Sequence, residues 1–347
     1  MRFKVGSLLK MFSEDIGIDL GTANTLVVVK NKGIVLNEPS VVAVNTKTNK
    51  IVEVGNKAKL MIGKTPDSIQ AIRPLKNGVI ADYEMTEKML REFYKIVLKR
   101  NVLTNPKVVI CVPAGVTQVE KRAVVDATKE AGAREAYLIE EPMAAAIGAG
   151  LDIFQPEGNM IVDIGGGTTE IAVISLGGIV KTSSLRFAGD KLDEAIVQYV
   201  RQKHNLLIGE KTAEEIKNKI AMATDESEEL TGEVRGRNIL NGLPRNISLK
   251  SSEIKDAITE FIEAIVEEIK VTLEKTPPEL AADIYQKGII LAGGGALIRD
   301  LDKRISESLQ IPVLVAEEPL NCVVRGIDRV LKDFDKYKEV IVSPSDY

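Results

Sequence analysis

The feature that most constrains the fold is a motif that occurs twice. An Asp precedes a Gly by two residues, and a turn rich in Gly and Thr follows between two apolar runs. The first copy, "GIDLGTANTLVVV", begins at Gly17, and the second, "IVDIGGGTTEIAVI", begins at Ile161. The two aspartates, Asp19 and Asp163, are separated by about the length of one domain. The repetition of one strand-turn-strand unit at this distance predicts two related lobes.

The composition of these turns indicates anion binding. Glycines and small hydroxylated residues leave backbone N–H groups unobstructed, and clustered N–H groups bind phosphate. No lysine of the P-loop type follows the glycines, so neither turn is a P-loop. An Asp at the end of the adjoining strand suits Mg²⁺, which bridges carboxylates to phosphate oxygens. Two such turns predict a clamp on a nucleotide's phosphates around one metal. The alternative is two tight hairpins whose glycines serve only the turns.

A third glycine-rich segment, "LAGGGALIRDL" at 291–301, follows an apolar run and precedes a helical pattern. Gly293, Gly294 and Gly295 would let the backbone approach a ligand closely, and a helix N-terminus would add positive potential. A turn of this kind is weak evidence by itself. It gains weight from the two aspartate turns.

Strands and helices alternate along the chain, which predicts α/β sheets with helices on their faces. The length of 347 residues exceeds the size at which a single core stops growing, and 44% hydrophobic residues are enough for two cores. We expect Met85, Met89, Phe93, Ile96 and Val97 to share the buried face of one helix. The expected strands are 16–20, 25–30, 33–44, 107–113, 161–174 with its turn, 287–294 and 311–316. The expected helices are 84–100, 117–133, 142–150, 296–309 and 322–334, with a mostly helical region at 191–275 that a strand-like piece interrupts at 229–249.

Several classes of function are disfavoured. A formal net charge of −4 provides no basic field for nucleic acid. Cys111 and Cys322 are far apart, and the single histidine, His204, has no cluster around it, which argues against a zinc site and favours a reducing cytosol. No apolar run has the roughly 18 residues that a membrane-spanning helix needs, and the N-terminus lacks the apolar region of a signal peptide. We expect a soluble or peripheral protein.

The motifs "DLGTANT", "DIGGGTTE" and "LAGGGALIRDL" resemble, in order and spacing, the phosphate-1, phosphate-2 and adenosine motifs of the actin, heat-shock chaperone and sugar kinase superfamily. Four further stretches, "GIVLNEPSVVAV", "IGKTPDSIQAIRPLKNGVIADY", "LIEEPMAAAIGAGL" and "FAGDKLDEAIVQYVR", are similar to the MreB family of bacterial actins. The resemblance covers residues 15 to 335. It implies an α/β, actin-like, two-lobed ATPase fold with two related α/β domains around a nucleotide cleft.

Each lobe in that family has a larger and a smaller subdomain. The resemblance implies an N-terminal amphipathic segment at 1–14, subdomain IA at 15–42, 77–148 and 326–347, subdomain IB at 43–76, subdomain IIA at 149–191 and 255–325, and subdomain IIB at 192–254.

The resemblance also implies ATP or ADP with Mg²⁺ as cofactors, and roles for individual residues. Glu141 would orient the attacking water and Thr168 would act with it, whereas the neighbouring Glu140 would point elsewhere. The alternatives are that Glu141 serves only as a charge at the helix start before Pro142, and that the residues 214–217 form only a solvated helix face. Asp19 and Asp163 would face the metal. The implied phosphate contacts are Thr22, Ala23, Asn24, Gly165, Gly166, Gly167 and Thr168, and the implied adenosine contacts are Glu214, Glu215, Ile216, Lys217, Gly294, Gly295, Ala296 and Leu297.

Residues 1–12, "MRFKVGSLLKMF", predict a short cationic amphipathic helix that binds an anionic membrane surface. A disordered leader, or a segment that covers the protein body, is the alternative. A second candidate anchor, which the resemblance provides, is the apolar part of the loop "KRNVLTNPK". The predicted membrane residues are Met1, Val5, Leu8, Leu9 and Phe12 in the helix and Val102 and Leu103 in the loop.

The resemblance therefore implies a slow ATPase that polymerises into paired protofilaments, is cytoplasmic and peripheral at the inner face of the membrane, governs cell shape and works with cell-elongation proteins. Two alternatives stay open. A sugar kinase of this superfold would need a substrate pocket and a catalytic Asp base, and we see no insertion for them. A chaperone-like ATPase would carry a further substrate domain, whereas the sequence ends at Tyr347.

Overall fold

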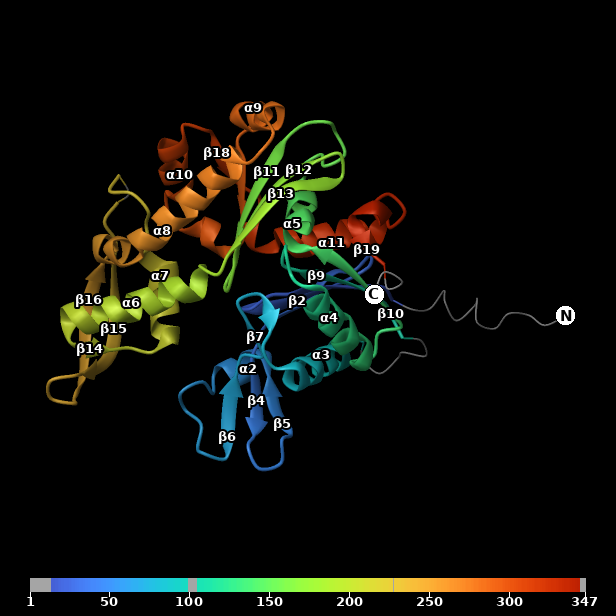
Figure 1. The fold of residues 1–347 in the computed structure, drawn as a ribbon. Coiled ribbons are helices and arrows are strands. Elements are labelled where there is room, and N and C mark those ends of the chain that lie inside the picture. Colours follow the sequence, from blue (N-terminus) through green and yellow to red (C-terminus); the bar gives the residue numbers. More distant parts are fainter. Residues whose placement is uncertain (1–13, 99–104, 227, 344–347) are drawn as a thin grey trace. The chain divides into compact units, whose positions relative to one another are not determined.

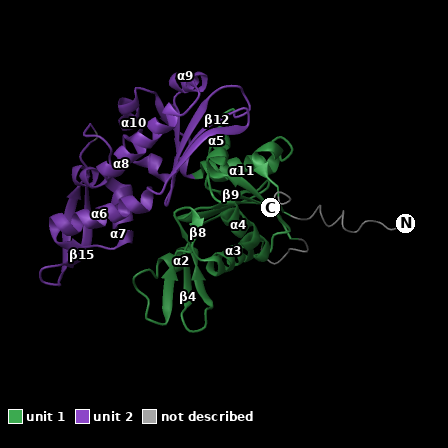
Figure 2. Cartoon of the chain, in the orientation of Figure 1, with its two compact units in different colours: residues 1–152, 321–347 green, residues 153–320 purple. Residues whose placement is uncertain are grey.

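The computed structural model describes residues 14–98, 105–226 and 228–343. The predicted membrane residues Met1, Val5, Leu8, Leu9, Phe12, Val102 and Leu103 lie outside these ranges. The chain divides into two compact units, residues 1–152 with 321–347 and residues 153–320 (Figure 2). Two units of similar size agree with the two lobes that the repeated motif predicts.

Unit 1 is built on a six-stranded sheet with the order β19-β10-β9-β1-β2-β3. Helices α5 and α11 lie on one face of this sheet, and α3 and α4 on the other (Figure 1). A smaller sheet, β5-β4-β6, carries α2, and β7 and β8 form a two-stranded ribbon. The strands are β1 (Ile16–Leu20), β2 (Asn24–Val29), β3 (Gly33–Pro39), β4 (Val42–Asn45), β5 (Ile51–Val54), β6 (Ile69–Ile72), β7 (Leu75–Lys76), β8 (Val79–Ile80), β9 (Lys107–Val112), β10 (Glu135–Glu140) and β19 (Ile341–Val342). The helices are α2 (Gly55–Lys59), α3 (Tyr83–Leu98), α4 (Gln118–Glu130), α5 (Glu141–Ala149) and α11 (Cys322–Lys332).

Unit 2 is built on a five-stranded sheet with the order β13-β12-β11-β17-β18. Helix α8 packs against β12 and β13, and α10 packs against α8 and β18 (Figure 1). A three-stranded sheet, β14-β15-β16, stands beside α6 and α7. The strands are β11 (Asn159–Ile164), β12 (Thr169–Ser175), β13 (Gly178–Leu185), β14 (Leu206–Leu207), β15 (Thr231–Asn238), β16 (Pro244–Lys250), β17 (Ile289–Ala292) and β18 (Val313–Val315). The helices are α6 (Gly189–His204), α7 (Glu210–Ile220), α8 (Ser251–Glu274), α9 (Pro278–Lys287) and α10 (Leu301–Leu309).

The two large sheets share one topology. In unit 1, β1, β2 and β3 form an antiparallel meander, β1 pairs on its other side with the parallel strand β9, and β9 pairs with the parallel strand β10. In unit 2, β11, β12 and β13 form the same meander, β11 pairs with the parallel strand β17, and β17 pairs with the parallel strand β18. Each Asp is the next-to-last residue of the first strand, and Asp19 faces Leu26 as Asp163 faces Glu170. The repeat predicted from the sequence is confirmed.

Each unit has its own hydrophobic core, produced by helical periodicity against buried strands. In α8 the five isoleucines at 254, 258, 262, 265 and 269 recur every three or four residues, and all are buried. In α3, Met85, Met89 and Phe93 are buried as predicted. Ile96 is an exception, because it is 52% exposed, whereas Val97 is half-buried and packs against the core as predicted.

Two other predicted elements are wrong in detail. The predicted strand 33–44 is two strands in different sheets, because the chain leaves β3 at Pro39 and enters β4 at Val42. The predicted helix 296–309 begins only at Leu301, since a 3₁₀ turn occupies Gly294–Leu297 and Asp300 adopts a left-handed conformation with φ of 57°. The sequence also did not predict β19, which pairs with β10 at the sheet edge.

Close helix packing fixes the position of α5 in unit 1. A Cβ atom built on Gly148 would overlap the carbonyl oxygen of Cys322, and one on Gly326 would overlap that of Ala144. The backbones of α5 and α11 therefore touch at these two glycines, and larger side chains would force the helices apart. This contact holds the first residue of α5, Glu141, in a defined place at the end of β10.

Candidate nucleotide-binding elements

The turn between β1 and β2 in unit 1 is fixed through its oxygen atoms. The Ser40 hydroxyl donates to the Gly21 carbonyl at 2.6 Å, and the Ser40 N–H donates to the Ala23 carbonyl at 3.0 Å. The Thr22 hydroxyl is buried and accepts the N–H of Gly78 at 2.9 Å. These bonds all engage acceptors of the turn, so its backbone N–H groups are the donors that an anion would use. Ala23 and the first residue of β2, Asn24, are half-buried beside them.

Asp19 is a buried carboxylate at the end of β1, with 8% of its surface exposed. Its Oδ1 accepts the thiol of Cys111 at 3.2 Å, and burial raises the pKa of Asp19 to about 6. Burial and the negative charges of Asp19 and Glu141 raise the pKa of the Cys111 thiol well above its usual value. A cation would offset the cost of burying Asp19, so the position suits a metal.

The two adjacent glutamates at the end of β10 have different surroundings. Glu140 pairs with Lys121, with 3.4 Å between Oε1 and Nζ. Glu141 is the first residue of α5, where Pro142 occupies the first turn as predicted, and its charge acts on Cys111. The helix N-terminus favours a carboxylate at this position. The two side chains therefore have different neighbours.

The turn between β11 and β12 in unit 2 is also fixed through its carbonyl oxygens. The N–H of Gly165 donates to the Thr168 carbonyl at 2.9 Å and closes the turn. The first two residues of α6 then donate to the turn, from Gly189 to the Gly165 carbonyl at 3.1 Å and from Asp190 to the Gly166 carbonyl at 2.8 Å. Gly167 and Thr168 are buried in this turn.

The third glycine turn packs directly on the end of β11. Strand β17 pairs with β11 so that Ala292 faces Asp163, which is 3% exposed. Gly293 has φ of 78°, and a Cβ atom there would overlap the Asp163 carboxylate and the Ile164 carbonyl. A Cβ on Gly295 would overlap the Ile164 side chain. Only glycine permits this approach, which brings the turn beside Asp163.

The remaining residues of the third turn differ in exposure. Gly294 is exposed, Ala296 is buried and Leu297 is 55% exposed. Within unit 2, the second turn, the third turn and Asp163 therefore gather at one end of the sheet. In open α/β sheets, ligands bind beyond the carboxyl ends of the strands, which is where these turns lie.

The predicted adenosine segment at 214–217 lies on α7, as the sequence predicts. Ile216 is buried against the core, whereas Glu215 is exposed and pairs with Lys211 at 3.7 Å. Glu214 is half-buried. Lys217 donates to the Gly189 carbonyl at 2.9 Å and pairs with Asp193 at 2.9 Å. The sequence did not predict the pairing of Asp193 with Lys217, although Asp193 lies within the stretch "FAGDKLDEAI".

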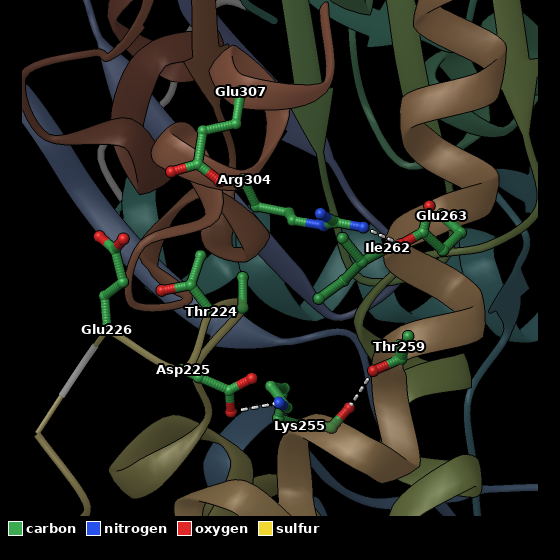
Figure 3. A pocket seen from close by; sticks show the side chains of 10 residues that line it. Thr224, Asp225, Glu226, Lys255, Thr259, Ile262, Glu263, Arg304 and Glu307 are labelled. Atoms are coloured by element: carbon green, nitrogen blue, oxygen red, sulfur yellow. Dashed lines mark hydrogen bonds and ion pairs between the residues drawn. The ribbon is translucent and has the colours of Figure 1, made fainter.

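A groove of about 340 Å³ lies elsewhere in unit 2, between the segment 223–226, α8 and α10 (Figure 3). Lys255 pairs with Asp225, and Arg304 pairs with Glu263 across it. Its lining contains none of the predicted nucleotide residues.

Among the residues that the structure describes, no group of three or more His, Cys, Asp or Glu side chains is arranged to hold a metal, and no helix is long and apolar enough to cross a membrane. Mg²⁺ usually keeps several waters and needs only one or two carboxylates.

Comparison with known proteins gives consistent results. The profile of the MreB/Mbl protein family matches residues 13–339. The chain is 54% identical over 332 residues to the cell shape-determining protein MreB of Escherichia coli K12, covering 94% of this chain and 96% of the relative. It is 51% identical over 326 residues to the cell shape-determining protein Mbl of Bacillus subtilis 168, covering 94% and 98%.

Solved structures give the same result. Crystal structures of MreB5 of Spiroplasma citri bound to AMPPNP and to ADP both match with a TM-score of 0.90 and 40% identity, covering 94% of this chain and 98% and 99% of theirs. The MamK double helical filament matches with a TM-score of 0.79 and 25% identity, covering 92% of this chain and 99% of that chain.

Proposed function

Because the chain belongs to the MreB/Mbl family of actin-like cytoskeletal proteins, we propose that it binds ATP with Mg²⁺, hydrolyses it slowly and assembles into filaments that govern cell shape. The observation that carries the nucleotide part is the repeated aspartate turn, which ends the first strand of the same sheet topology in both units. The solved relative MreB5 holds AMPPNP or ADP, which supports an adenine nucleotide as the ligand.

The residues present fit a nucleotide and its metal. Two turns offer backbone N–H groups, and each adjoins a buried carboxylate, Asp19 or Asp163, of the type that Mg²⁺ prefers. The bound Mg²⁺ would neutralise charge that develops on the transferred phosphoryl group. Thr22, Ala23 and Asn24, together with Gly165 to Thr168, would hold the phosphates. The third glycine turn, from Gly294 to Leu297, and residues 214–216 of α7 would hold the adenosine.

Hydrolysis needs an oriented water more than covalent chemistry. We assign that role to Glu141, because α5 packs through Gly148 on α11 and the charge of Glu141 acts on the Cys111 thiol, which donates to Asp19. Thr168, buried in the second turn, would contact the same water or the phosphate beside it. Glu140 takes no part, since Lys121 already pairs with it.

Assembly is the first test of this proposal. Adding ATP and Mg²⁺ to the purified protein is expected to raise light scattering and to produce filaments under the electron microscope, because head-to-tail contacts that do not close give a polymer. The MamK double helical filament, which shares the fold, supports this expectation. Particles that stay monomeric at high protein concentration with ATP and Mg²⁺ would contradict the filament proposal. A small-molecule kinase of the same superfold would behave in that way.

We further propose that filaments lie on the cytoplasmic face of an anionic membrane and act with cell-elongation proteins. Removal of residues 1–12 is expected to reduce co-sedimentation with vesicles that contain anionic lipid, and added salt is expected to reduce binding of the full chain. A variant with Val102 and Leu103 replaced by Ser tests the second candidate anchor. If the truncated chain pellets as fully as the complete chain, the N-terminal segment is not the sole anchor.

A further inference from the structure

Lys217 makes two buried contacts within unit 2. Its ammonium pairs with Oδ1 of Asp193 at 2.9 Å and donates to the Gly189 carbonyl at 2.9 Å. The two side chains are only 12% and 10% exposed. Helix α7 supplies the lysine, and the first two turns of α6 supply both acceptors. The pair therefore ties α7 to the N-terminus of α6.

The same peptide segment holds the second phosphate turn. The N–H of Gly189 donates to the Gly165 carbonyl, and the N–H of Asp190 donates to the Gly166 carbonyl. A Cβ atom on Gly189 would lie 3.3 Å from the Lys217 ammonium and 3.4 Å from the Gly165 carbonyl oxygen, so little space separates the three groups. The Thr169 hydroxyl donates to the Phe187 carbonyl at 2.6 Å and fixes the approach to α6. A short chain of hydrogen bonds thus connects Lys217 to the turn at 165–168.

We propose that Lys217 is a positioning residue for the second phosphate turn rather than a contact of the adenosine. The buried Lys217–Asp193 pair holds the Gly189 peptide, and that peptide holds the carbonyls of Gly165 and Gly166 so that the N–H groups of the turn face the phosphates. This inference rests on the proposed function, because it takes the turn to be a phosphate site.

The charges of the pair support this role. Burial raises the pKa of Asp193 to about 6, although Lys217 acts in the opposite direction. The carboxylate therefore depends on the ammonium to remain charged in this position. Removal of one partner from a buried pair leaves the other uncompensated, which costs more than the pair contributes. An ammonium that is held in this buried pair is not available to contact the adenosine.

The test compares ligands that have phosphates with one that lacks them. Lys217→Met is expected to weaken ATP and ADP binding about tenfold, the scale of one hydrogen bond to a charged group, and to change adenosine binding less than about twofold. Competition against a fluorescent ATP analogue measures all three affinities. Asp193→Asn is expected to show the same selective loss, and Lys219→Met, on the exposed part of the same helix, to show none.

A double variant keeps the test valid if a single variant unfolds. Lys217→Met with Asp193→Leu replaces the buried pair with apolar side chains, which such sites tolerate. We expect it to fold and still to lose ATP and ADP affinity selectively. Equal loss of ATP, ADP and adenosine affinity in Lys217→Met, with Asp193→Asn unchanged, would overturn the inference and assign Lys217 to the adenosine. If the unmodified chain fails to bind ATP, the proposed function fails instead.

Discussion

Replacement of Glu141 with Gln is expected to lower the rate of ATP hydrolysis by at least about 100-fold while ATP affinity changes little. A positioned side chain that orients or deprotonates the nucleophile typically contributes this factor, and the amide keeps the size of the carboxylate without its charge. Phosphate release under single-turnover conditions measures the hydrolysis rate, and a fluorescent ATP analogue measures binding. The proposed role predicts that only the first of these readouts changes.

The neighbouring residue provides a matched control. Glu140→Gln removes the same charge one residue earlier, from a side chain that pairs with Lys121. Its loss is expected to leave hydrolysis within about twofold of the unmodified rate, because the proposal gives Glu140 no contact with the attacking water or the phosphates. If Glu141→Gln hydrolyses ATP at the unmodified rate, or if Glu140→Gln shows the larger defect, Glu141 does not orient the water.

The sheets could be predicted largely from one repeated motif. A strand that ends in Asp-x-Gly and returns through an apolar run specifies an antiparallel pair, and its recurrence at 19 and 163 predicted two equivalent sheets. The periodicity of α3 identified most of its buried face, because burial repeats every three or four residues. Ile96 shows the limit of this method. Whether the last turn of a helix is covered depends on a neighbour that is distant in sequence.

The elements that were wrong are those decided by tertiary contacts. The chain between Pro39 and Val42 turns out of one sheet because Ser40 bonds to Gly21 in the first turn and to Thr25 in β2. The helix after the third glycine turn starts late because Gly293 and Gly295 must first lie on Asp163 and Ile164. Neither contact has a local signal, so composition read along the chain could not supply it.

The predicted nucleotide elements fall into two kinds. The turns at 165–168 and 294–297 come together with Asp163 in unit 2, where strand pairing alone brings them to one end of the sheet. The supporting partners are different, because Cys111 and Asp193 act through a single hydrogen bond or charge to a residue far away in sequence. The sequence around a buried thiol, or around a second Asp in a helix, does not indicate which distant residue it will contact. Structure was needed to find both.

The effect of Asp163 on metal binding is the second large expectation. Asp163→Asn keeps the volume that Gly293 packs against, so the third turn should stay in place while the charge disappears. A neutral amide is a poor substitute for a carboxylate near Mg²⁺. We therefore expect the gain in ATP affinity on adding Mg²⁺ to fall by about tenfold to 100-fold, the scale of one charged interaction that is largely buried.

Affinity measured with excess chelator provides the internal control for Asp163→Asn. Without Mg²⁺ the variant should bind ATP as well as the unmodified chain or better, because it removes a negative charge that repels the phosphates. Titration of a fluorescent ATP analogue with and without Mg²⁺ gives both values. If the unmodified chain binds ATP equally in both conditions, or if the variant retains the full Mg²⁺ dependence, Asp163 does not serve the metal. If the unmodified chain binds ATP equally with and without Mg²⁺, the aspartates and glycines of the two turns would serve only to form tight hairpins.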